Sequence, residues 1–187
     1  MHTAGCRMDR IIPVVTVKQL SDTERILSAL RQAGARSAEI TFRTDCAADA
    51  IALAVRRFPE LKIGAGTVVN ADQASQAIAA GARFVVSPGL SEEAALICRS
   101  HGIDYYPGCV TPTEIMRAIA MDLTTLKFFP AEFFGGLRAL KALSAPFPQI
   151  RWIPTGGIDR AKAAEYLACD RVFAVGGSFP VEEALSL

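Results

Sequence analysis

Short apolar runs alternate with amphipathic stretches from one end of the chain to the other. Eight runs have the length and residue types of buried strands, and they are 11–17, 37–43, 61–68, 83–89, 103–109, 125–131, 150–156 and 171–177. This alternation is typical of a parallel sheet whose strands are joined by crossover helices. Eight such units most simply close into a (β/α)8 TIM barrel, in which active sites line the C-terminal strand ends. An open doubly wound sheet is disfavoured, because no GxGxxG follows the first strand.

The seven amphipathic segments between these runs have recognisable ends. Capping boxes are expected at Ser21–Glu24 and at Thr111–Glu114, the second with a proline at the first helical position. Further helix N-caps are expected at Asn70, Ser91 and Asp159. Ala-Gly-Ala-Arg occurs at 33–36 and again at 80–83, where the glycine suits the left-handed position after a helix.

The end of the series departs from the repeat. Only nine residues follow Ser178, so the eighth helix is expected to be missing or very short. Apolar surface near the last strand is then expected to be covered by a subunit contact or by the N-terminal segment. No linker or change of composition interrupts the series, so residues 1–187 are predicted to form a single barrel domain.

Composition and charge exclude several classes of protein. Hydrophobic residues make up 51% of the 187 residues, which argues against intrinsic disorder. The formal net charge is +1 and no basic block occurs, so nucleic-acid binding has no electrostatic support. No apolar run approaches the roughly 20 residues that span a bilayer, and no signal peptide is evident, so we expect a cytoplasmic protein without a membrane partner.

Cysteine and histidine usage gives no sign of a disulfide framework or a metal centre. The five cysteines are scattered without a CxxC pair, at positions 6, 46, 98, 109 and 169. Reduced cytosolic thiols fit this spacing better than disulfides do. The two histidines, His2 and His101, make a zinc site or a His-centred triad hard to assemble, so no metal is expected.

The second predicted strand carries polar residues where a barrel wall should be apolar. Alternation within 37–43 places Glu39, Thr41 and Arg43 on the inner face, while the apolar residues between them pack under helices. A buried carboxylate and guanidinium are costly unless they are paired or used. The residues therefore leave two interpretations open: a structural Glu–Arg pair, or a catalytic carboxylate with an anion-binding arginine.

The sixth predicted strand contains a lysine at its centre. Alternation places Leu126 and Phe128 on one face, and Lys127 and Phe129 on the other. Its apolar surroundings favour the uncharged amine that attack on a ketone requires. The alternative is a strand-end lysine that extends to solvent.

Glycines gather at four predicted strand ends. Those at 155–157 and 176–178 follow strands seven and eight, where barrels of this kind commonly bind phosphate through backbone N–H groups. Those at 64–67 and 87–89 follow strands three and four, and they would let the backbone approach a ligand closely. Ordinary tight turns are the alternative at each place.

Taken together, these segments resemble the 2-keto-3-deoxy-6-phosphogluconate (KDPG) / 4-hydroxy-2-oxoglutarate (KHG) aldolase family. The resemblance runs from Pro13 to Ser178 and rests on EITFRTDCA at 39–47, GAGTV at 64–68, SPGL at 87–90, PGCVTPTE at 107–114, LKFFPAE at 126–132, PTGGI at 154–158 and GGS at 176–178. It implies a class I aldolase that needs no metal or other cofactor and is usually a homotrimer. The implied substrate is KDPG, cleaved to pyruvate and glyceraldehyde 3-phosphate, and also KHG, cleaved to pyruvate and glyoxylate.

The resemblance also implies a role for each site residue. Lys127 would form the Schiff base and Glu39 would transfer protons, while Arg43 and Thr67 would hold the substrate carboxylate. The remaining expected site residues are Pro88, Phe129 and Thr155 in the substrate pocket, and Gly156, Gly157, Gly177 and Ser178 at the phosphate.

Other functions remain open at this point. The Phe42-Arg43-Thr44 segment is more similar to the gluconate branch, but a 6-phosphogalactonate-type aldolase shares most motifs. Two further enzymes to consider are an isomerase or epimerase with Glu39 as its base, and a metal-dependent pyruvate aldolase with Glu39 as a ligand. From a different class, a degenerate barrel without activity would act only as a phosphate-binding module.

Overall fold

The computed structural model describes residues 9–186, and within them eight strands alternate with eight helices. The strands are β1 (Ile11–Val15), β2 (Ser37–Thr41), β3 (Lys62–Gly66), β4 (Phe84–Val86), β5 (Asp104–Tyr106), β6 (Thr125–Phe128), β7 (Arg151–Pro154) and β8 (Val175–Gly177). The helices are α1 (Asp22–Gln32), α2 (Ala47–Arg57), α3 (Ala71–Ala79), α4 (Glu92–Ser100), α5 (Pro112–Ala120), α6 (Gly136–Ser144), α7 (Arg160–Leu167) and α8 (Phe179–Leu185). The predicted alternation is confirmed. His2 and Cys6 lie outside the described residues.

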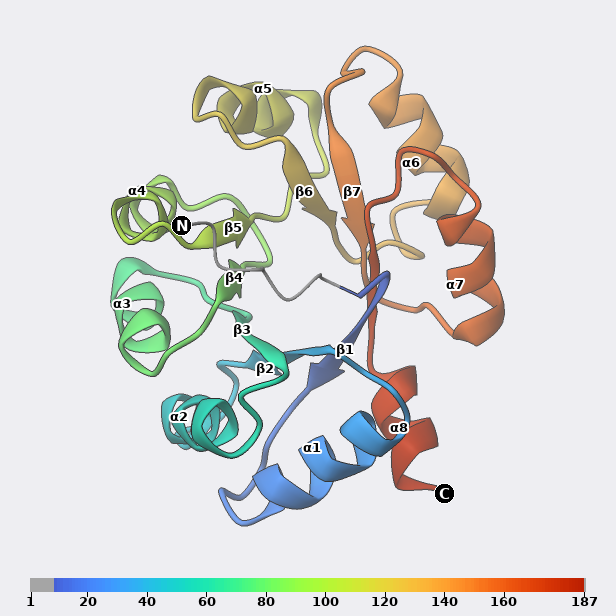
Figure 1. The fold of residues 1–187 in the computed structure, drawn as a ribbon. Helices are drawn as coiled ribbons and strands as arrows, with labels where there is room; N and C mark the ends of the chain where they lie inside the picture. The colour runs from blue at the N-terminus through green and yellow to red at the C-terminus, as the bar shows by residue number, and fades with distance from the viewer. Residues whose placement is uncertain (1–8, 187) are drawn as a thin grey trace.

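All the strand pairs are parallel, and the sheet curls. Six strands pair in the order β5-β4-β3-β2-β1-β8, while β6 pairs with β7. Single bridges join these two groups, between Gly108 and Lys127 on one side and between Thr155 and Gly176 on the other. In Figure 1 the strands surround a common centre and the helices form the outer layer. The C-terminal strand ends therefore meet at one end of the molecule.

Several strands are shorter than the apolar runs predict. The ladder between β2 and β3 ends where Thr41 lies opposite Gly66, and the Phe42 N–H still donates to the Gly66 carbonyl at 2.7 Å. Arg43 then lies in the turn that follows, and it is exposed. The prediction that Arg43 shares the inner face of the strand is therefore wrong, because the strand ends before this residue.

The helix ends predicted from capping residues and glycines are confirmed with one exception. Thr111 and Glu114 form a capping box, and the expected N-caps at Asn70, Ser91 and Asp159 each accept a backbone N–H. Gly34 and Gly81 have φ of 88° and 94°, the expected left-handed conformation. The box predicted at Ser21 is wrong. Ser21 already has helical φ and ψ of −60° and −24°, and its side chain makes no cap hydrogen bond.

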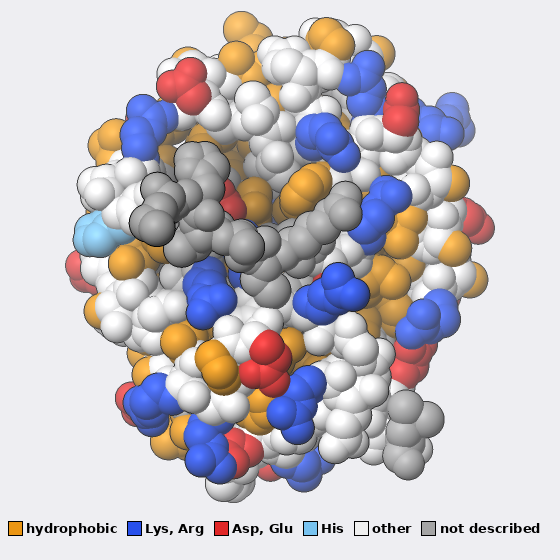
Figure 2. Space-filling view, in the orientation of Figure 1, with side chains coloured by type: hydrophobic (Ala, Val, Ile, Leu, Met, Phe, Trp, Pro, Cys, Tyr) orange, Lys and Arg blue, Asp and Glu red, His pale blue; other side chains and the backbone are white. Residues whose placement is uncertain are grey.

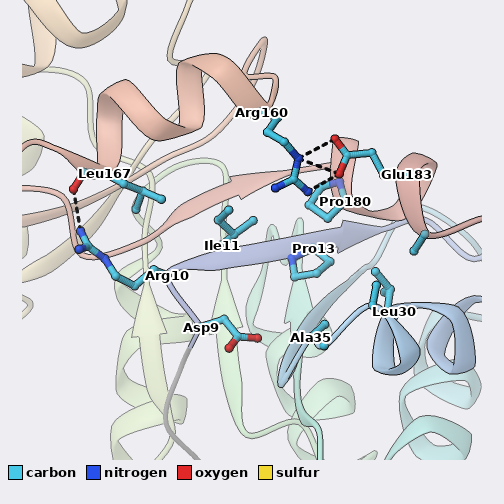
Figure 3. A pocket seen from close by; sticks show the side chains of 13 residues that line it. Asp9, Arg10, Ile11, Pro13, Leu30, Ala35, Arg160, Leu167, Pro180 and Glu183 are labelled. Carbon is cyan, nitrogen blue, oxygen red and sulfur yellow. Dashed lines mark hydrogen bonds and ion pairs between the residues drawn. The ribbon is translucent and has the colours of Figure 1, made fainter.

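The eighth helix is short, as predicted, with seven residues. Beside it lies a groove of about 550 Å³, here called the outer groove, between α1, α7, α8 and the outer side of β1 (Figure 3). Ile11, Pro13 and Leu30 contribute apolar lining. Apolar surface was expected near the last strand, β8. The groove agrees with this expectation, because β1 pairs with β8. Arg160 of α7 and Glu183 of α8 form an ion pair at its edge (Figure 3).

The core lies on both sides of the sheet. Two large apolar clusters fill the space between strands and helices. A third is formed mainly by residues of β1, β4, β5 and β7, and its buried members are Ile12, Phe84, Val86, Tyr106, Ile153 and Ala174. Phe84 and Val86 alternate with Val85, which belongs to a helix-facing cluster, so the third cluster lies inside the curl.

Surface charge agrees with the near-neutral composition. Figure 2 shows Lys and Arg side chains scattered over one face, with apolar and uncharged surface between them, rather than gathered in one continuous patch. Among the described residues, no helix is long and apolar enough to cross a membrane.

Candidate active site

Lys127 lies buried at the C-terminal end of β6. Its neighbours Leu126 and Phe128 belong to the helix-facing core, so alternation turns the lysine to the inside of the curled sheet. Its side chain is 4% exposed, and its Nζ lies 3.6 Å from Oε1 of Glu39, whose side chain is 2% exposed. The Phe129 ring covers the amine, with 5.1 Å between Nζ and the ring centroid. A primary amine and a carboxylate therefore share a site from which water is largely excluded.

Glu39 reaches this position across the inside of the sheet from β2. Its Oε1 is buried and has no hydrogen-bond partner among the described residues. A buried carboxylate oxygen without a hydrogen bond is destabilising, so such a group is more often found where chemistry uses it. The carboxylate has room only because residue 66 of the neighbouring strand is glycine. A Cβ on Gly66 would lie 2.5 Å from Cγ of Glu39.

Both glycines of β3 leave room for side chains of the neighbouring strands. Gly66 accommodates Glu39, and a Cβ on Gly64 would collide with the Phe84 ring. The expected close approach of this strand's backbone to a ligand stays a prediction.

Arg43 and Thr67 lie together beyond the ends of β2 and β3. Arg43 Nε donates a hydrogen bond to Thr67 Oγ1 at 3.1 Å. Thr67 has φ of 55°, a left-handed conformation that a β-branched residue rarely adopts. Strain of this kind is concentrated at functional sites, where surrounding structure holds it. The guanidinium is free to bind an anion through its remaining N–H groups.

A cavity of about 380 Å³, here called the strand-end cavity, lies between Phe129 and the turns that follow β7 and β8. Its lining residues are Val14, Arg43, Phe129, Thr155, Gly156, Gly157, Ile158, Asp159, Gly177, Ser178, Phe179 and Glu182. Seven of the eleven predicted site residues lie in this list. The predicted Glu39–Lys127 pair does not line the cavity, but Phe129, which does, also packs against Lys127 Nζ.

The turn after β7 presents backbone donors to this cavity. Gly156 and Gly157 have φ of 101° and 75°, so other residues would be strained there. Within residues 9–186, neither of their N–H groups donates a hydrogen bond, whereas their neighbour Thr155 donates its N–H to the Phe128 carbonyl. Free N–H groups that line a cavity suit an anionic ligand.

Thr155 and Pro88 have different surroundings. Thr155 is buried, and Gly176 of β8 leaves room for it, because a Cβ there would lie 2.5 Å from the threonine Oγ1. Pro88 does not line the strand-end cavity. Its carbonyl packs against Gly108, and Gly108 forms a β-bridge with Lys127. Pro88 is therefore separated from β6 by Gly108 alone.

Glu132 ties the segment after β6 to the glycine turn, and the sequence did not reveal this role. Its carboxylate accepts from Lys162 Nζ at 2.7 Å and from the Tyr166 hydroxyl at 2.8 Å. The Lys162 hydrogen bond lowers the pKa of the Glu132 carboxyl. The backbone N–H of Glu132 donates to the Gly156 carbonyl at 3.2 Å. These bonds fix the turn whose Gly156 and Gly157 line the cavity.

Two acidic residues in the strand-end cavity were also missed. Asp159 was predicted only as a helix cap, and Glu182 was not singled out. The four-residue spacing of Ser178 and Glu182 is the one signal that could have linked the glutamate to the predicted site.

Metal-ligating residues do not gather at this site or elsewhere in the described chain. No group of three or more His, Cys, Asp or Glu residues between positions 9 and 186 has the geometry to hold a metal ion.

Fold and site together define a class of protein: a parallel α/β protein with a buried lysine amine beside a carboxylate inside its curled sheet. The model of the KDPG and KHG aldolase family matches residues 3–186. The chain belongs to this family of aldolases, which are carbon–carbon lyases, and the resemblance found in the sequence is confirmed.

Individual relatives are similar over most of the chain. The 2-dehydro-3-deoxy-phosphogluconate aldolase of Treponema pallidum (strain Nichols) is 45% identical over 172 residues, which cover 92% of this chain and 82% of the relative. The KHG/KDPG aldolase of Escherichia coli (strain K12) is 42% identical, covering 91% and 80%. Among solved structures, the KDPG aldolase of Legionella pneumophila has a TM-score of 0.89 at 40% identity, covering 95% of this chain and 86% of that one. That structure holds pyruvate captured at low pH as a covalent carbinolamine intermediate.

Proposed function

We propose that this chain is a class I aldolase that cleaves KDPG to pyruvate and glyceraldehyde 3-phosphate through a Schiff base on Lys127. The observation that carries the proposal is the buried pair of Lys127 Nζ and Glu39 Oε1, 3.6 Å apart at the strand ends. The carbinolamine held by the Legionella pneumophila relative is the first intermediate of such a reaction.

The first steps form the imine. The neutral amine of Lys127 attacks the C2 ketone of the substrate, and the product is a carbinolamine. Glu39 accepts a proton from the nitrogen and returns one to the departing hydroxyl, which leaves as water. The carboxylate lies within reach of both atoms without moving its strand, because Lys127 and Glu39 face each other inside the sheet.

The iminium then accepts the electron pair of the breaking bond. A base removes the proton of the C4 hydroxyl, the C3–C4 bond breaks, and glyceraldehyde 3-phosphate leaves with an aldehyde group at the former C4. The C3–C4 electrons move into an enamine on Lys127. Protonation at C3 and hydrolysis of the imine release pyruvate, and the water lost earlier is returned. We assign these proton transfers to Glu39, which is the carboxylate beside the amine.

Two groups of residues hold the ends of the substrate in this proposal. Arg43 and Thr67, joined by their hydrogen bond, bind the C1 carboxylate. The free N–H groups of Gly156 and Gly157, with Gly177 and Ser178, bind the phosphate. Phe129 and Thr155 form the wall between these ends, and Pro88 supports the site from its place against Gly108, which bridges to Lys127.

KHG fits the same chemistry, so we propose it as a second substrate. It carries the same ketone and carboxylate next to the bond that breaks, and its products are pyruvate and glyoxylate. The name of the matching family includes both substrates. The shorter chain of KHG reaches the reacting pair without the phosphate contacts.

We further propose that the eight strands close into one TIM barrel in a single domain. The bridges at Gly108–Lys127 and Thr155–Gly176 support closure, because they lie on the two sides where the pair β6–β7 meets the other six strands. We also propose a cytoplasmic homotrimer. Sedimentation of the purified chain tests this state, and a monomer at all concentrations would contradict it.

The activity is tested by offering KDPG and measuring pyruvate. The wild-type chain is expected to release pyruvate, faster from the gluconate than from the galactonate epimer, and Lys127→Ala is expected to release none above background. Lys62→Ala is the matched control, since Lys62 also lies on a strand and pairs with a carboxylate, that of Asp104 at 3.2 Å. Equal loss in both variants, or full activity in Lys127→Ala, would contradict the proposal.

A further inference from the structure

The strand-end cavity contains two carboxylates that the proposed reaction does not use. Asp159 and Glu182 line it, whereas Arg43 is its one cationic residue among the described lining residues. Asp159 is engaged in structure, because its Oδ1 caps α7 by accepting the Lys162 N–H at 2.9 Å. Glu182 caps no helix. Its side chain contacts Ser178, at the end of the cavity where the phosphate is proposed to bind.

Glu182 already accepts the hydrogen bond of the Ser178 hydroxyl, which the phosphate is proposed to bind. An N-cap serine hydroxyl usually accepts a backbone N–H from the first turn of its helix. Ser178 does not, and its Oγ instead donates to Glu182 Oε1 at 3.0 Å. A phosphate that binds Ser178 must therefore displace this carboxylate and then remain close to its negative charge.

The neighbouring glutamate shows that α8 is held in place. Glu183 lines the outer groove rather than the cavity, and both of its oxygens accept from Arg160 Nε at 3.0 Å (Figure 3). This ion pair joins α8 to α7. Glu182 therefore makes room by rotating its own exposed side chain, and its position one helical turn from Ser178 keeps it beside the proposed phosphate site.

We propose that Glu182 is a specificity-determining residue that weakens the binding of phosphorylated substrates relative to unphosphorylated ones. The proposal rests on the proposed function, which places the phosphate at this end of the cavity. The repulsion is moderate, because Glu182 is exposed and solvent screens its charge. For a single exposed charge beside a phosphate dianion, we expect the affinity for the phosphorylated ligand to be weakened about fivefold.

The test compares two aldehydes in the reverse reaction, the condensation with pyruvate. Glyceraldehyde 3-phosphate and glyceraldehyde differ only in the phosphate. In Glu182→Gln and Glu182→Ala, the ratio of their kcat/KM values is expected to rise about fivefold in favour of the phosphorylated aldehyde. Inorganic phosphate should inhibit both variants at correspondingly lower concentrations, and added salt should reduce both effects.

Glu93→Gln is the matched control, because it removes one exposed carboxylate from α4, which contributes nothing to the strand-end cavity. Its ratio should equal that of the wild type. An unchanged or lower ratio in both Glu182 variants would overturn the inference, as would an equal rise in Glu93→Gln.

Failure of the inference can be distinguished from failure of the proposed function. Borohydride reduction with pyruvate labels the Schiff-base lysine without any phosphate. Labelling of Lys127 together with an unchanged ratio refutes only the role of Glu182. If the wild type is not labelled, the proposed function and the inference that rests on it fall together.

Discussion

A single methyl group on β3 should disable the proposed active site without touching the substrate. In Gly66→Ala, the new Cβ would lie 2.5 Å from Cγ of Glu39 and 2.6 Å from its Cδ. Carbon atoms in contact are usually at least about 3.5 Å apart, so the glutamate must retreat by about 1 Å. Such a displacement changes the 3.6 Å separation between Glu39 and Lys127 on which proton transfer depends.

The expected loss of activity is large compared with the loss of stability. A displacement of about 1 Å at a catalytic group can reduce the rate about 100-fold. Overpacking in a core typically lowers the free energy of unfolding by about 1–3 kcal/mol, which a stable domain of this size can tolerate. We therefore expect Gly66→Ala to fold, with kcat for KDPG cleavage lowered by about two orders of magnitude.

Kinetics and denaturation measured on the same preparation separate these effects. Gly89→Ala is the matched control, because a Cβ at Gly89 meets nothing within 4 Å. This control should keep both its stability and its kcat. If Gly66→Ala folds and retains kcat within about twofold of the wild type, Glu39 does not need its observed position and the reasoning fails.

Three further predictions concern stability and reactivity. The pKa of the Glu132 carboxyl is lowered chiefly by Lys162, so Glu132→Gln should cost about 1 kcal/mol in urea unfolding at pH 7. Because the folded-state pKa lies below the ordinary 4.5, this difference should shrink as the pH falls below that value, and a constant difference would contradict the ion pair. Burial raises the pKa of the Cys109 thiol to about 12, so iodoacetamide should alkylate the less buried Cys46 first in the native protein, as peptide mass spectrometry would show. Thr111→Ala should lower the free energy of unfolding by about 1 kcal/mol by removing the capping box, and an unchanged urea midpoint would refute this.

The order of elements was predictable because apolar periodicity is a local property of the sequence. The capping box at Thr111 and the left-handed Gly34 and Gly81 followed from residue types that have few alternatives. Ser21 has the same sequence signature as Thr111, yet it forms no box. The chain before α1 already turns, with the Asp22 N–H bonded to Gln19, so Ser21 lacks the extended backbone that a box requires.

The partners within the site were less predictable, because they depend on contacts between distant parts of the chain. Alternation turned Glu39 and Lys127 inward, but only the structure shows that they meet at 3.6 Å. Arg43 was misplaced, since the end of a strand depends on the length of its neighbour. Glu132 has no local signature of its contacts with α7, and for Glu182 the only local signal is its four-residue spacing from Ser178.

The central claim is tested most directly by the chemistry of one lysine. Purified protein is incubated with pyruvate and reduced with borohydride, and the modified peptide is sequenced by mass spectrometry. We expect one reduced pyruvyl group per chain, on Lys127, and none in Lys127→Ala, while Lys62→Ala is labelled like the wild type. Labelling that is absent, or that falls on other lysines and persists in Lys127→Ala, would contradict the Schiff-base mechanism.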